Sequence, residues 1–251
     1  MKLFKILSIL SIYLLSMSVM SSNIKQFKGN NSNNEIFVGR HDKKPIKTKY
    51  NLSGLPTGRK WLTSKEWKGK HIKKNDIIMR SRFQSWKKIH IETFINFFGA
   101  EIQKEVNQNF PDLCASVIIA QAIIESNFGL SRLAVQGNAL FGHKHKSKKG
   151  KYIVAHDDSP TDKFSVYSSQ WFSIRAHSHL MNDKYKNRIV GNYNQKNWLI
   201  ALCGAMNPKA SRKYHKDGNF LYATSCMTKV CYSEKLRRII KYYNLTRFDK
   251  K

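Results

Sequence analysis

The apolar positions between residues 91 and 106 recur at steps of three and four, which is typical of one face of an amphipathic helix. This face consists of Ile91, Phe94, Ile95, Phe98, Ile102 and Val106. Pro111 marks the break after it. The segment from Leu113 to Ser126 is apolar nearly all round, so we expect a second, central and buried helix that Gly129 stops.

Beyond residue 144 the pattern becomes strand-like. A polar loop over 144–151 precedes two short β-prone runs, 152–156 and 163–167, with turn-forming residues between them, and this predicts a small hairpin.

Three further helices are expected after the hairpin. The first is capped by Ser168 or Ser169, and the others lie around 198–203 and 232–243. The fold class is therefore α+β, with a mostly helical lobe and a small β-hairpin lobe flanking a cleft.

The first 85 residues look different from the rest. Residues 1–21 carry two lysines, an apolar run and then small residues, which predicts a secretory signal peptide; an uncleaved membrane anchor is the alternative, although the run is short for a span. Residues 22–85 are rich in Asn, Lys and Gly and lack a sustained apolar period, so we expect a basic, largely irregular arm. Residues 86–251 form one folded domain, expected to be monomeric, with no membrane span once the signal is removed.

The chain carries 45 Lys and Arg against 16 Asp and Glu, a net charge of +29. Such a charge attracts polyanions, and export favours the anionic polymers of a cell envelope as partners. No recognised nucleic-acid-binding motif accompanies the basic residues, so no nucleic-acid partner is expected. Charge that merely aids solubility is the remaining alternative.

Four cysteines lie in the predicted domain. Cys226 and Cys231 would close the shortest disulfide loop, whereas Cys114 and Cys203 lie in apolar helical runs typical of buried thiols. Neither the cysteines nor the His143/His145 and His177/His179 pairs have the spacing of a metal site, so no metal and no cofactor is expected.

Glu125 is the only carboxylate in the apolar segment from Leu113, and it falls in the last turn of that predicted helix. Burial and the negative end of the helix dipole both disfavour its charged form, so we expect a raised pKa. A glycosidase needs such a protonated carboxyl to protonate the departing glycosidic oxygen. Gln121, one turn earlier, is expected to line the same cleft. A solvent-exposed glutamate at a helix end is the alternative.

The segments around Glu125 resemble the glucosaminidases of glycoside hydrolase family 73. AQAIIESNFGLSRLA at 120–134 is followed by NALFGHK at 138–144, by a hairpin with a Tyr-Ser step, and by Tyr222-Ala223-Thr224 before Tyr232. These blocks occur in the family's order over roughly residues 86–245, which makes the resemblance specific.

The resemblance implies a lysozyme-like fold and hydrolysis of the β-1,4 bond between N-acetylglucosamine and N-acetylmuramic acid in peptidoglycan, outside the cytoplasm. Residues 86–251 would be the catalytic domain, with Glu125 as the general acid. A second carboxylate in the hairpin matches Asp162 best, and Asp157 and Asp158 are its rivals, although these two would also suit a role in shaping the hairpin turn alone. The second carboxylate would activate water, stabilise an oxocarbenium ion, or be dispensable where the substrate's own N-acetyl group attacks.

Side chains of the matching blocks are the candidate substrate-binding residues. They are Gln121, Phe128, Asn138, Phe141, Tyr222 and Tyr232. Aromatic rings stack on the C–H faces of sugars, and Phe128 and Phe141 are equally typical of a core.

This chain also departs from the family pattern. Leu221 replaces a glycine, residues 225–231 replace a short Asp-Pro link, His143 stands at an often apolar position, and Asp162 replaces a glutamate. Two alternatives follow: a lytic transglycosylase acting on the same glycan, and a non-catalytic basic protein that binds the cell wall.

Overall fold

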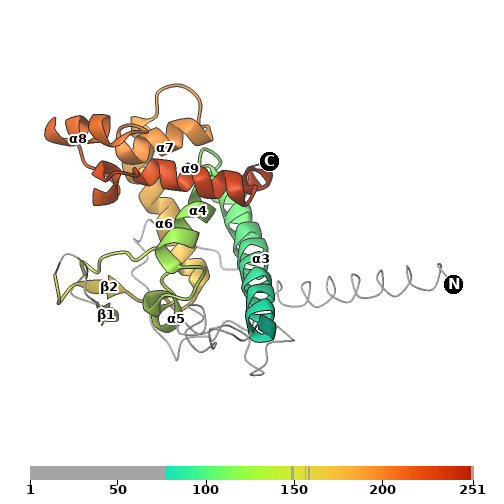
Figure 1. Ribbon diagram of the computed structural model, residues 1–251. Helices are drawn as coiled ribbons and strands as arrows, with labels where there is room; N and C mark the ends of the chain where they lie inside the picture. The colour runs from blue at the N-terminus through green and yellow to red at the C-terminus, as the bar shows by residue number, and fades with distance from the viewer. Residues whose placement is uncertain (1–76, 148–149, 156, 158, 250–251) are drawn as a thin grey trace. The chain divides into compact units, whose positions relative to one another are not determined.

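The computed structural model describes residues 77–147, 150–155, 157 and 159–249 (Figure 1). The predicted signal peptide and most of the predicted arm lie outside the described residues. Within the described part of the chain, no helix combines the length and apolarity that crossing a membrane requires.

The first described helix, α3 (Ile77–Asn109), begins earlier than expected. Residues 77–85 fall in the segment assigned to the largely irregular arm, and in the structure they form the first part of this helix. The predicted apolar face is confirmed, since Phe94, Phe98 and Ile102 are almost completely buried.

Helix α4 (Ala115–Ser126) is the centre of the fold, as predicted. It contacts α3, α7 and α9 and lies among them in Figure 1. Ten of its twelve residues are buried, which explains its nearly continuous apolar sequence. The helix starts two residues later than expected and ends at Asn127, which takes a left-handed conformation, before Gly129 is reached.

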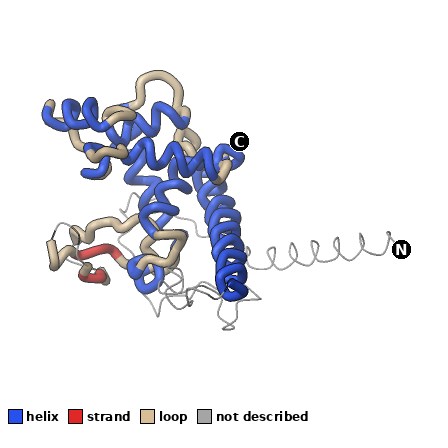
Figure 2. Tube along the Cα trace, viewed as in Figure 1, coloured by secondary structure: helices blue, strands red, loops and turns tan. Residues whose placement is uncertain are grey.

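The predicted hairpin is confirmed. Strands β1 (Tyr152–Val154) and β2 (Lys163–Ser165) pair antiparallel, with Ile153 opposite Phe164 (Figure 2). The short helix α5 (Arg132–Gly137), which was not predicted, lies before the hairpin and contacts β1.

The chain after the hairpin is helical. It comprises α6 (Gln170–Tyr185), η1 (Lys186–Arg188), α7 (Gln195–Cys203), α8 (Pro208–Lys216), η2 (Thr224–Met227), α9 (Tyr232–Tyr242) and η3 (Leu245–Phe248). The three predicted helices correspond to α6, α7 and α9, and Ser169 occupies the N-cap of α6. Helix α8 was missed because its residues are mostly polar and give no apolar period.

The disulfide pairing differs from the expected one. Cys203 at the end of α7 bonds to Cys226 in η2, with 5.3 Å between the Cα atoms, while Cys231 is a buried free thiol. The shortest loop was the wrong criterion, because the packing of η2 against α8 and α9 brings Cys226 to Cys203. Cys114 is a buried thiol, as predicted.

Candidate active site

The turn after α4 fixes the backbone that carries Glu125. Ser126 Oγ donates a hydrogen bond to the Ala122 carbonyl (2.6 Å) and accepts one from the Gly129 amide (2.8 Å). Gly129 has a φ of 76°, which favours glycine. Ser131 then caps α5 by accepting a hydrogen bond from the Ala134 amide. The serines and glycine of the motif thus build the turn rather than act in chemistry.

Glu125 is half-buried in the last turn of α4. Its Oε1 accepts a 2.7 Å hydrogen bond from the Tyr232 hydroxyl at the start of α9. Burial raises the pKa of Glu125, the negative charge of Asp157 raises it further, and the Tyr232 hydrogen bond opposes both. The predicted upward shift is confirmed, with burial as its largest cause.

The hairpin carboxylates have different surroundings. Asp162 accepts hydrogen bonds from Lys144 Nζ (2.6 Å) and from the Ser159 amide (2.9 Å), so it helps to shape the turn. Asp157 is exposed and forms a 2.8 Å ion pair with Lys144. Its negative charge raises the pKa of Glu125. Asp158 lies outside the described residues. Because of its charge, Asp157 is the carboxylate that we favour as an influence on the acid.

Two candidate aromatic residues lie against each other beside Glu125. The rings of Tyr222 and Tyr232 stack with centroids 5.3 Å apart, and Tyr222 keeps part of its surface exposed, whereas Tyr232 is buried. Two links tie the segment that carries Tyr222 to the end of α7. The Tyr222 backbone amide donates a hydrogen bond to the Leu202 carbonyl, and Cys226, four residues after Tyr222, forms the disulfide with Cys203. Tyr222 is thus held on α7 and is the better placed of the two to meet a sugar.

The other candidate substrate-binding residues are more deeply placed. Phe128 is half-buried and packs edge-on against Phe94. Phe141 is buried, and so is Asn138, whose side-chain amide donates to the Tyr167 carbonyl at 2.9 Å. Their burial favours structural roles over direct contact with a ligand.

Gln121, one turn before Glu125, is fully buried. We had expected it to line the cleft, and this expectation was wrong because the side chain has no exposed surface. Its Oε1 lies 3.1 Å from His177 Nε2, and His177 Nδ1 lies 3.0 Å from His143 Nε2. The sequence pattern did not link these two histidines. In the described part of the chain, no three His, Cys, Asp or Glu side chains gather where they could hold a metal ion.

A comparison with known families assigns the chain. The family described as mannosyl-glycoprotein endo-beta-N-acetylglucosaminidase matches residues 100–245, more than half of the chain, and this match includes Glu125 and Tyr232. The chain belongs to this glucosaminidase family.

Curated relatives of this glucosaminidase-family protein include a probable N-acetylmuramidase of Lactococcus lactis subsp. cremoris, 30% identical over 171 residues, which cover 63% of this chain and 35% of the relative. The exo-glucosaminidase LytG of Bacillus subtilis is 28% identical over 143 residues, covering 53% of this chain and 45% of LytG. The chain thus matches less than half the length of each.

Among solved structures, the catalytic domain of the autolysin Auto from Listeria monocytogenes is similar with a TM-score of 0.46 and 26% identity, covering 63% of this chain and 87% of that domain.

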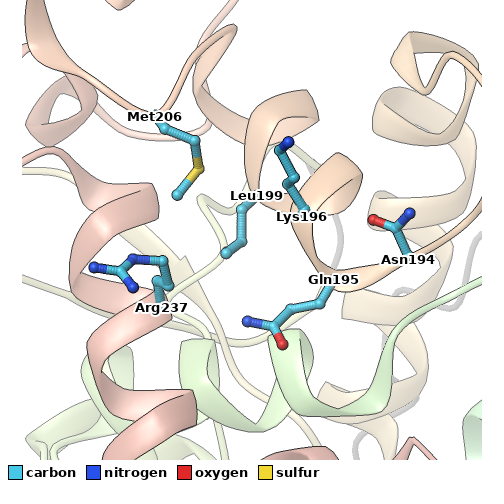
Figure 3. Close-up of a pocket in the computed structure, with 6 residues that line it drawn as sticks. All are labelled: Asn194, Gln195, Lys196, Leu199, Met206 and Arg237. Carbon is cyan, nitrogen blue, oxygen red and sulfur yellow. The ribbon is translucent and has the colours of Figure 1, made fainter.

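The glucosaminidase-family chain also has a pocket of about 350 Å³ whose lining does not include Glu125 (Figure 3). Its lining comes from α7, the loop after it and α9: Asn194, Gln195, Lys196, Leu199, Met206 and Arg237. The guanidinium of Arg237 is paired with Glu234 at 2.7 Å. No predicted site residue lines this pocket, and none of its lining residues is a carboxylic acid.

Proposed function

We propose that this protein is a peptidoglycan hydrolase that cleaves the β-1,4 bond between N-acetylglucosamine and N-acetylmuramic acid, with Glu125 as the general acid. The observation that carries the proposal is the half-buried Glu125 carboxyl with its raised pKa, hydrogen-bonded by Tyr232. A carboxyl with a raised pKa keeps its proton to higher pH than an ordinary glutamic acid and can give it to the departing glycosidic oxygen. Family membership of residues 100–245 supports the same reaction class.

In this mechanism the Tyr232 hydroxyl fixes the Glu125 side chain before the sugar arrives. Proton transfer from Glu125 then breaks the glycosidic bond and leaves positive charge at the anomeric carbon. The Tyr232 hydrogen bond also stabilises the carboxylate that remains. Tyr222, which is half-buried, is the tyrosine that we favour as a stacking partner for the glycan in the predicted cleft.

Water must then reach the anomeric carbon. Asp157 is the described carboxylate that we favour for this step, because its charge acts on Glu125 while the Asp162 carboxylate is engaged in the hairpin turn. Attack by the substrate's own N-acetyl group is the other route, and it needs no second carboxylate. Neither route calls for a metal ion.

Peptidoglycan lies outside the cytoplasm, so we place the protein in the cell envelope or in the medium. Residues 1–21 would serve as the signal for export. The net charge, +29 for the full chain and +27 without Lys2 and Lys5 of the signal, would hold the protein on anionic envelope polymers, and added salt would weaken that attachment. Sequencing the N-terminus of the mature protein tests the predicted cleavage.

Analysis of the released glycans by mass spectrometry identifies the bond. A glucosaminidase leaves N-acetylglucosamine at the reducing end, whereas the N-acetylmuramidase activity named for the Lactococcus relative would leave N-acetylmuramic acid there. A lytic transglycosylase would leave an anhydro sugar with no water added.

The decisive comparison is wild type against Glu125→Gln on purified peptidoglycan in a zymogram. The wild type is expected to clear the gel and the variant to lose at least about 100-fold of the activity, because an amide has no proton to give. Unchanged clearing by the folded variant would exclude Glu125 as the acid. A wild type that binds peptidoglycan and does not cut it would favour the non-catalytic alternative.

A further inference from the structure

A line of hydrogen bonds leads through the interior toward Glu125. It starts at the Tyr167 hydroxyl, 2.8 Å from His143 Nδ1. The two histidine rings then meet at 3.0 Å, and His177 Nε2 meets Gln121 Oε1 at 3.1 Å. These four residues come from the loop before the hairpin, the segment after β2, α6 and α4, so only the folded chain brings them together.

Both imidazoles are neutral at ordinary pH. Burial lowers the pKa of His143 to about 4 and that of His177 well below its ordinary value, with the neighbouring ring of His143 adding to the effect on His177. The titratable side chains in ring contact with this pair are Tyr167 and Tyr222, and burial raises the pKa of each, so both keep their protons. The pair therefore lies among uncharged groups.

With the Gln121 amide oxygen toward His177, one pair of tautomers satisfies every contact. A neutral imidazole has one N–H and one acceptor nitrogen. Gln121 Oε1 can only accept, so His177 Nε2 donates and His177 Nδ1 accepts. His143 Nε2 must then donate to His177, and His143 Nδ1 accepts from the Tyr167 hydroxyl. All three hydrogen bonds point toward Gln121.

Gln121 continues the line toward the acid. With Oε1 bound to His177, its Nε2 is buried and has no hydrogen-bond partner of ordinary geometry among the described residues. Gln121 lies one turn before Glu125 on α4, and Tyr232 binds Glu125, so the Gln121 amide lies on the side of the helix that meets the Tyr232 hydroxyl. A side-chain hydrogen bond from Gln121, which lowers the pKa of Tyr232, agrees with the amide nitrogen facing that hydroxyl. When the Gln121 amide nitrogen donates a hydrogen bond to the Tyr232 oxygen, the Tyr232 hydroxyl becomes a stronger donor. This hydroxyl donates the 2.7 Å hydrogen bond to Glu125.

Packing keeps the His177 ring in place. The ring stacks on Phe141 at 3.8 Å with 2° between the planes, and Tyr222 meets it edge-on at 6.0 Å. The ring plane is therefore fixed by its neighbours, and the hydrogen bonds decide only the tautomer.

We propose that His143 and His177 are positioning residues for the acid: they hold the Gln121 amide with its nitrogen toward Tyr232 and so set how strongly Tyr232 hydrogen-bonds Glu125. This inference rests on the proposed function of Glu125. The histidines do not deliver a proton to the sugar, because the amide of Gln121 separates them from Tyr232 and holds its own N–H protons.

Two substitutions of His177 separate positioning from packing. His177→Phe keeps a ring to stack on Phe141 and loses the donor, whereas His177→Gln places an amide N–H near the position of Nε2. With soluble uncrosslinked glycan strands as substrate, we expect His177→Phe to lose about tenfold in kcat with KM changed by less than about twofold, and His177→Gln to recover most of the loss.

The pH profile gives the second readout. The Tyr232 hydrogen bond lowers the pKa of Glu125, so a weaker bond lets that pKa rise, and the alkaline limb of activity in His177→Phe moves to higher pH. His179→Gln, a change to an exposed histidine on the same helix, should leave the profile unchanged. A folded His177→Phe variant whose kcat and alkaline limb match the wild type would overturn the proposal.

Nitrogen NMR of the wild type tests the tautomers without any activity. His143 and His177 should both show the neutral Nε2–H form at pH 7. Titration of His177 near its ordinary pKa of 6.5, or an Nδ1–H form of either ring, would overturn the proposal. This result does not depend on whether His177→Phe folds. A wild type that cuts no glycan contradicts the proposed function first, whereas an active wild type with the wrong tautomers contradicts this inference alone.

Discussion

The Tyr232 hydroxyl donates a 2.7 Å hydrogen bond to Glu125 Oε1 across 107 residues of sequence. This contact joins the end of the central helix α4 to the start of α9, and it opposes the burial that raises the pKa of the acid. The position of Glu125 and its readiness to release a proton thus depend on the same tyrosine.

Tyr232→Phe removes this hydrogen bond and keeps the ring stacked on Tyr222. The pKa of Glu125 should rise, because the bond that favours its ionised form is lost, and the alkaline limb of activity should move to higher pH. We expect kcat to fall by about tenfold as the carboxyl loses its fixed orientation. Tyr242→Phe, at an exposed position of the same helix, is the matched control, and an effect of equal size there would contradict the prediction.

Asp157→Asn is expected to change the pH profile of activity, whereas Asp162→Asn is expected to lower the free energy of unfolding. Removing the charge of Asp157 takes away a cause of the raised pKa of Glu125, so the alkaline limb should move to lower pH. Asp162→Asn weakens the hydrogen bonds to Lys144 and to the Ser159 amide and should cost about 1 kcal/mol of stability. Urea unfolding and pH–rate profiles of both variants check this; a pH shift in Asp162→Asn alone would reverse the assignment.

Glu125→Gln should be more stable than the wild type at pH 8. The pKa of Glu125 in the folded protein lies above its ordinary value of 4.5. At pH values between the unfolded-state pKa and the folded-state pKa, the folded protein binds more protons than the unfolded chain. The free energy of unfolding of the wild type therefore falls as the pH rises through this range. Glutamine has no such dependence. Thermal unfolding at several pH values should show the advantage of the variant shrinking toward pH 4, and a constant difference at every pH would argue against burial of the charge.

Loss of the Cys203–Cys226 disulfide should destabilise the domain. The bridge joins residues 23 apart, and constraining a loop of that length stabilises by about 3 kcal/mol. Reductant should therefore lower the Tm of the wild type and leave that of the Cys203→Ala/Cys226→Ala double variant unchanged. If Cys226 paired with Cys231 instead, Cys231→Ala would abolish the effect of reductant.

Local pattern predicted most of the helices and the hairpin. The face around Phe94 and the apolar run of α4 are local signals, since each residue's burial follows from its place in a regular helix. Helices α5 and α8 were missed, because α5 is only six residues long and α8 is mostly polar. The disulfide was missed because sequence spacing does not show that η2 packs on α8 and α9, where Cys226 meets Cys203.

The sequence by itself determined that Glu125 ends a buried helix, since periodicity and the motif around Glu125 are properties of neighbouring residues. Only the tertiary structure decided what surrounds that carboxyl. Tyr232 of α9 donates a hydrogen bond to it, and His177 of α6, 56 residues from Gln121 in the sequence, contacts Gln121 one turn before it. The reason is geometric. Which side chains of two helices meet depends on how the helices cross and rotate against each other, and packing of the whole core sets those angles.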